Sequence, residues 1–271
     1  MNDPSTAQPI SIALPDSLVA TRIGEVGYLK LNRPAKRNAV DNVTVEGMRM
    51  FFSELPADIR VVVLSSEGPH FCAGLDLTSI VDHHEGLEGV LHSRMWHRAF
   101  EAIRMGTVPV ISVLRGAVIG GGLELAMATH IRVAERTAYF GLPEGQRGIF
   151  LGGGGSVRIT RLLGVDRVQD MMLTGRILSA EEGHAGGLAQ YIVGDGEGLA
   201  QAQALAAKIA ANAPMTNFAV IQALPRIADT DIANGLFTES LMASIAQTSP
   251  EAKRRLADFL EGRTTKMKPG E

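Results

Sequence analysis

The sequence has a single cysteine, Cys72, among its 271 residues. One cysteine excludes a disulfide within the chain, so we expect a protein of a reducing compartment, the cytoplasm. Aromatic residues make up only 5% of the chain, and no apolar run reaches the roughly 20 residues of a membrane-spanning helix. No basic residue precedes Arg22, so we expect neither a secretion signal nor an arginine-rich transit peptide.

The chain also has little net charge, with a formal value of −3. Because the basic residues are scattered, we expect neither a nucleic-acid partner nor a membrane partner. His83 and His84 are adjacent, so their side chains point apart, and no third ligand has a suitable spacing. We therefore expect no metal site. With 45% hydrophobic residues, the chain can bury a large core as one domain or as a domain with an appendage.

Apolar patterns divide the chain into three parts. Residues 1–16 contain three prolines and indicate a loosely held arm, residues 17–197 repeat strand, strand and helix, and residues 198–271 are almost wholly helical. The predicted strands cover 17–23, 26–31, 61–64, 110–114, 131–134, 138–140 and 189–193. The predicted helices cover about 42–55, 91–105, 123–128, 155–163, 166–173, 180–185, 196–212, 214 onward, 236–247 and 250–261, with an irregular segment at 78–89.

Three glycines, Gly120 to Gly122, lie between a predicted strand and a helix that carries Glu124. The first N–H groups of a helix have no intrahelical partner, so they can donate to a negatively charged oxygen. Alternatively, the glycines only allow the helix to pack closely on the sheet. A P-loop is excluded because no Gly-Lys-Ser/Thr follows, and a dinucleotide-binding motif is excluded because Leu125 occupies the position of its last glycine.

Two further loops carry small residues. The segment from Phe71 to Leu77, with sequence FCAGLDL, is either a tight buried turn or a second site of backbone donors. The loop from Gly141 to Gly148 places one carboxylate, Glu144, between glycines. Spacing alone does not bring the carboxylates of Glu124 and Glu144 together, and both can equally be structural.

The motifs taken together resemble the crotonase superfamily, the enoyl-CoA hydratase/isomerase family. The resemblance covers nearly the whole chain and rests on the order and spacing of Asn32-Arg33-Pro34 with Asn38-Ala39, of Phe71 to Asp76, and of Gly120 to Glu124. Further matches are Phe140 to Glu144, Gly152 to Gly155, Leu173 to Gly175, and Asp258 to Leu260.

The resemblance implies an α/β fold, a spiral of ββα units, followed by a C-terminal helical region that drives formation of a trimer or of a hexamer of paired trimers. It also implies an acyl-CoA thioester substrate and no separate cofactor, because coenzyme A is part of the substrate.

The same resemblance implies roles for individual residues. Backbone N–H groups of Leu75 and Gly121 would form an oxyanion hole, and Glu124 and Glu144 would be catalytic. The implied substrate-binding residues are Ala73, Asp76, Leu77 and Thr78 near the acyl thioester, and Lys36 and Arg37 near the CoA phosphates. Lys266 or Lys268 of a neighbouring subunit is a further phosphate candidate.

Hydratases of the family that the sequence resembles carry two glutamates, so Glu124 and Glu144 favour a hydratase, which adds water across the 2,3 double bond of a 2-enoyl-CoA. An enoyl-CoA isomerase, a hydratase-lyase and a catalytically silent acyl-CoA-binding protein stay open as alternatives. A dienoyl-CoA isomerase is disfavoured, because Gly152 stands where that group has an acid. Residues 145–150 depart from the usual hydratase sequence close to the acyl end, which leaves the acyl-chain preference open.

Overall fold

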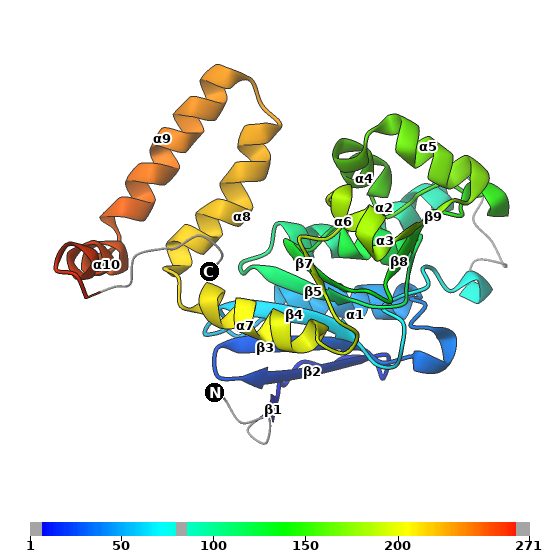
Figure 1. The fold of residues 1–271 in the computed structure, drawn as a ribbon, viewed down its shortest axis with the longest axis horizontal. Coiled ribbons are helices and arrows are strands. Elements are labelled where there is room, and N and C mark those ends of the chain that lie inside the picture. The colour runs from blue at the N-terminus through cyan, green and yellow to red at the C-terminus, as the bar shows by residue number, and fades with distance from the viewer. Residues whose placement is uncertain (1–6, 80–85, 264–271) are drawn as a thin grey trace. The chain divides into compact units, whose positions relative to one another are not determined.

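The structure is a computed structural model that describes residues 7–79 and 86–263. It consists of two compact units, Met1–Ile209 and Ala210–Glu271 (Figure 1). The boundary expected after residue 197 stays a prediction. His83, His84, Lys266 and Lys268, which were considered above, lie outside the described residues. Across the described part of the chain, no helix combines the length and apolar character needed to cross a membrane.

The first unit is built on a seven-stranded sheet with strand order β1-β2-β3-β4-β5-β7-β10 (Figure 1). Its strands are β1 (Gln8–Pro9), β2 (Leu18–Ile23), β3 (Val26–Leu31), β4 (Val61–Ser66), β5 (Val110–Leu114), β7 (Ile131–Glu135) and β10 (Tyr191–Val193). The β2–β3 hairpin is antiparallel, and β3, β4, β5, β7 and β10 pair in parallel. Every residue of β4 and β5 is buried, as their continuous apolar runs predict.

A second, three-stranded sheet has the order β6-β8-β9. It consists of β6 (Ala117–Ile119), β8 (Tyr139–Gly141) and β9 (Ile177–Ser179). The segment that follows β4 joins this sheet, because Cys72 N donates to Ala117 O at 2.9 Å and Ile119 N donates to Cys72 O at 3.1 Å. The sheet thus gathers segments that are far apart in the sequence.

The helices of the first unit agree with most of the predicted ranges. They are α1 (Asn42–Ser53), α2 (Leu87–Arg104), α3 (Gly121–Ala126), α4 (Gly155–Leu163), α5 (Val165–Thr174), α6 (Ala180–Ala185) and α7 (Gly198–Ala210), with short 3-10 helices at Pro34–Lys36, Leu77–Ser79 and Gly145–Arg147. Asp41 caps α1 by accepting from Thr44 N, and Ser179 caps α6. The prediction that the chain stays irregular to residue 89 was wrong. The first turn of α2 is helical although it contains Gly89, a poor helix former, and although its apolar side chains Leu87 and Val90 are exposed.

The second unit is helical, with α8 (Pro214–Ala228), α9 (Ile232–Thr248) and α10 (Pro250–Leu260). Pro214 and Pro250 stand in the first turns of their helices, where a missing N–H costs no intrahelical bond. The predicted α/β class and helical C-terminal region are confirmed.

Candidate active site

A hollow of about 360 Å³ opens beside the second sheet. Of the residues implied above, it is lined by Ala73, Leu75, Leu77, Gly121, Glu124 and Glu144. Further lining residues are Gly74, Gly89, His92, Ser93, Trp96, Gly120, Arg147, Ile149, Phe150, Leu151, Gly152 and Gly153. The structure therefore brings both glutamates and both implied amide donors to one cavity.

Strand pairing explains why the two glutamates share the hollow. Strands β6 and β8 run in parallel, with Ile119 opposite Gly141, and each strand leads directly into one glutamate-bearing segment. Gly120 N donates to Gly141 O at 2.9 Å and holds the two segments together. A Cβ atom on Gly120 would lie 2.7 Å from Glu144 Oε1, and its φ of 54° also favours glycine.

The backbone amides of Leu75 and Gly121 lie close together. A Cβ atom placed on Gly121 would be 3.5 Å from Leu75 N, and one on Gly74 would be 3.4 Å from Gly121 N. Gly74 has a φ of 97°, which a side chain would strain. Within residues 7–79 and 86–263, neither amide nitrogen has a hydrogen-bond partner. Both can therefore donate to a ligand oxygen.

The Glu124 carboxylate is buried and held by backbone donors. Its residue is 3% exposed, and Oε1 accepts from Gly153 N at 2.9 Å and Gly155 N at 2.7 Å. Burial raises the pKa of Glu124, and these N–H bonds act against that rise. A Cβ atom on Gly155 would lie 2.7 Å from Glu124 Cγ, so the helix start requires glycine there.

The Glu144 carboxyl is held differently. Its residue is 6% exposed, and the buried Oε2 has no hydrogen-bond partner among the described residues. Burial raises the pKa of Glu144 to about 7; the charge of Glu124 adds to the rise, and that of Arg147 opposes it. This carboxyl therefore gains and loses a proton near neutral pH.

Four residues of the implied substrate site do not line the hollow. These are Lys36, Arg37, Asp76 and Thr78. Asp76 Oδ2 instead pairs with Lys36 Nζ at 2.8 Å and with Arg33 Nη2 at 2.9 Å. Bonds from Lys36, Thr78 and Arg33 hold the pKa of Asp76 well below its usual range. This ion-pair cluster fixes the Phe71–Asp76 segment, and the substrate-binding roles of its members stay predictions.

Trp96 belongs to the buried core and also lines the active-site hollow. It is 3% exposed, and its ring packs edge-on against that of Phe100, with 5.5 Å between the ring centroids. A Cβ atom placed on Gly121 would lie 2.9 Å from Cζ3 of Trp96. Gly153 and Gly155 could not be identified as donors from the sequence, because a backbone N–H leaves no side-chain signature.

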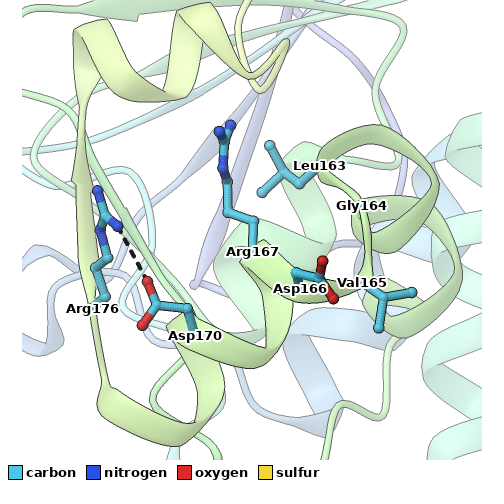
Figure 2. A pocket seen from close by; sticks show the side chains of 7 residues that line it. All are labelled: Leu163, Gly164, Val165, Asp166, Arg167, Asp170 and Arg176. Carbon is cyan, nitrogen blue, oxygen red and sulfur yellow. Dashed lines mark hydrogen bonds and ion pairs between the residues drawn. The ribbon is translucent and has the colours of Figure 1, made fainter.

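A second hollow, of about 490 Å³, lies at the junction of α4 and α5 (Figure 2). It is lined by Leu163, Gly164, Val165, Asp166, Arg167, Asp170 and Arg176. Arg176 is paired there with Asp170 at 3.2 Å, and none of the residues implied above reaches it. The smaller hollow around the glutamates is therefore the candidate active site.

Comparison with known proteins agrees with this geometry. Residues 21–269 match the family model for enoyl-CoA hydratase/isomerase. A crystal structure from Rhodopseudomonas palustris, provisionally named an enoyl-CoA hydratase, is 51% identical, covers 94% of this chain and 98% of its own, and has a TM-score of 0.89. The human mitochondrial enoyl-CoA hydratase domain-containing protein 2 is 36% identical, covering 88% of this chain and 83% of its own.

A structure from Thermobifida fusca, solved in complex with acetoacetyl-CoA, is 28% identical with a TM-score of 0.77. It covers 85% of this chain and 94% of its own. These structures confirm the predicted crotonase-like fold. The chain therefore belongs to the enoyl-CoA hydratase/isomerase family of the crotonase superfamily.

Proposed function

We propose that this protein is an enoyl-CoA hydratase, which adds water across the 2,3 double bond of a 2-enoyl-CoA to give a 3-hydroxyacyl-CoA. The observation that carries the proposal is one hollow lined by two buried carboxyl groups and two neighbouring backbone amides. Family membership and the relative solved with acetoacetyl-CoA support an acyl-CoA thioester as the ligand class.

The amides of Leu75 and Gly121 hold the thioester oxygen in this proposal. When water adds to Cβ, the electrons of the double bond move toward the carbonyl, and the oxygen becomes enolate-like. Fixed donors aimed at such an oxygen are each worth roughly 2.7–4 kcal/mol when removed one at a time. Neither amide has a competing partner within the described residues, so both can serve the substrate.

The glutamates exchange the protons of the reaction. The Glu124 carboxylate, oriented by Gly153 and Gly155, takes a proton from the attacking water. Cα takes a proton from Glu144, whose pKa near 7 leaves it partly protonated at neutral pH. Exchange with solvent then removes the proton from Glu124 and restores the one on Glu144 before the next turnover. A positioned acid or base of this kind contributes about 10²–10⁴-fold to the rate.

We further propose that Lys36 and Arg37 contact the CoA phosphates and that the protein assembles as a homotrimer or hexamer. Lys36 pairs with Asp76 but keeps half of its side chain exposed, so it can share its charge with a phosphate. Apolar side chains on α9 and α10 are exposed, including Leu236, Phe237, Leu256, Phe259 and Leu260, and their burial would stabilise an assembly.

Crotonyl-CoA provides the test. Hydration removes the conjugated enoyl thioester and its ultraviolet absorbance, and we expect the native protein but not a Glu144→Gln variant to remove it. Supplying 3-enoyl-CoA tests isomerisation instead, because that reaction creates the conjugated band. Turnover of 3-enoyl-CoA without hydration of crotonyl-CoA would reverse the assignment, and no change with any acyl-CoA would refute an enzymatic role.

A further inference from the structure

A third hollow, of about 430 Å³, adjoins the active site. It shares three consecutive residues with the active-site hollow, namely Ile149, Phe150 and Leu151. These three residues form a partition with the carboxyl groups on one side and helices α4 and α5 on the other. We call the space beyond the partition the distal groove.

The distal groove is apolar. One stripe of α5 supplies Val165, Val168, Met172 and Leu173, whose spacing places them on the same helix face. The polar lining side chains are uncharged and include Ser156 and Thr160 of α4. Burial of a charged or strongly polar ligand would be costly there, whereas burial of a hydrocarbon is favourable.

The partition is anchored at its ends but loosely packed in the middle. Ile149 N donates to Glu144 O at 3.1 Å, and Gly152 O accepts from Ser93 Oγ at 2.7 Å. Between these anchors, Phe150 is 72% exposed and Ile149 is 40% exposed. Because Phe150 has little buried area to lose, its side chain can turn aside at small cost.

The groove also begins next to the reacting carboxyl group. Gly145, the residue after Glu144, lines the distal groove, while Glu144 itself lines the active site. An acyl chain whose double bond lies at Glu144 is therefore close to a residue that lines the groove. Four of its eleven lining residues, Gly145, Ile149, Phe150 and Leu151, come from the loop that follows Glu144, and the other seven come from α4 and α5. Residues 145–150 of this loop are the stretch where the sequence departs from the usual hydratase pattern.

We propose that the distal part of an alkyl acyl chain passes the Ile149–Leu151 partition and lies in the distal groove. This proposal rests on the proposed hydratase function and specifies its substrate class, 2-enoyl-CoA thioesters with long apolar chains. Each methylene transferred from water into the groove is expected to raise kcat/KM by about fourfold.

Filling the groove tests the proposal. A Met172→Trp variant should lower kcat/KM for 2-dodecenoyl-CoA by tenfold or more and leave crotonyl-CoA within about twofold, because the short chain ends before the partition. Leu173→Trp, at a residue that is 77% exposed, should act in the same direction and is tolerated more easily by the fold. Val157→Trp is the matched control, since Val157 lies on α4, is 52% exposed and lines neither hollow.

The outcomes separate this proposal from the hydratase assignment. Suppose that crotonyl-CoA is turned over and that all three tryptophan variants change kcat/KM equally for both substrates. This result would refute acyl-chain binding in the distal groove and leave the hydratase assignment unaffected. If neither substrate is turned over, binding of saturated dodecanoyl-CoA and butyryl-CoA, measured by calorimetry, still decides the question. In that case Met172→Trp must weaken the binding of dodecanoyl-CoA and leave the binding of butyryl-CoA unchanged. An altered oligomeric state with unchanged chain-length preference would show that protein surface, not substrate, fills the groove.

Discussion

Replacing Glu144 with glutamine should make the protein less active and, at alkaline pH, more stable. The fold raises the pKa of Glu144 from 4.5 to about 7, so the folded state binds this proton more tightly than the unfolded chain does. The resulting stabilisation is fully present below the unfolded pKa and is lost as the pH rises through 7. The pKa difference between 4.5 and about 7 corresponds to about 3.4 kcal/mol at most, at 1.36 kcal/mol per pKa unit.

A glutamine at this position carries no charge at any pH. Relative to the variant, the native protein should therefore lose about 2–3 kcal/mol of unfolding free energy between pH 5 and pH 8. Urea unfolding of both proteins at fixed protein concentration and at several pH values measures this difference. A Glu88→Gln change at an exposed position of α2 serves as the control. Parallel stability curves for the native protein and Glu144→Gln would refute the reasoning.

Three further predictions concern the site and its support. Gly121→Pro should lower kcat/KM for crotonyl-CoA by about 10²–10³-fold relative to Gly121→Ala. Both substitutions crowd Trp96, but only proline removes the backbone N–H. Equal activities of the two variants would contradict the donor role of Gly121. Glu124→Gln should lower kcat by about 10²–10⁴-fold with little change in acetoacetyl-CoA affinity, and a loss confined to affinity would count against proton transfer. Asp76→Asn should cost about 1–3 kcal/mol in urea unfolding, since Arg33 loses a charged partner; a change below about 0.5 kcal/mol would show that the ion-pair cluster does not stabilise the fold.

The sequence predicted the central strands and the C-terminal helices because their signals are local. The runs Val61–Leu64 and Val110–Leu114 are continuously apolar, and both are buried within the main sheet. By contrast, β1, β6 and β9 span only two or three residues. These three strands were not predicted, because their formation depends on pairing of β1 with β2 and of β6 and β9 with β8.

In the candidate site, too, local features were predictable from the sequence and long-range pairing was not. The glycines and glutamates were visible as residue types, but the convergence of Glu124 and Glu144 depends on the parallel pairing of β6 with β8. That pairing could not be predicted from spacing. The position of Asp76 was equally hidden, because its two ion-pair partners come from a segment roughly forty residues earlier.

The most direct test of the central claim uses crotonyl-CoA in water enriched with oxygen-18. If the two carboxyl groups and the paired amides catalyse hydration, the native protein forms 3-hydroxybutyryl-CoA that carries one heavy oxygen, which mass spectrometry detects. A Glu124→Gln, Glu144→Gln double variant should form no such product. Crotonyl-CoA recovered unchanged from the native protein, or a product formed equally by the double variant, would contradict the account.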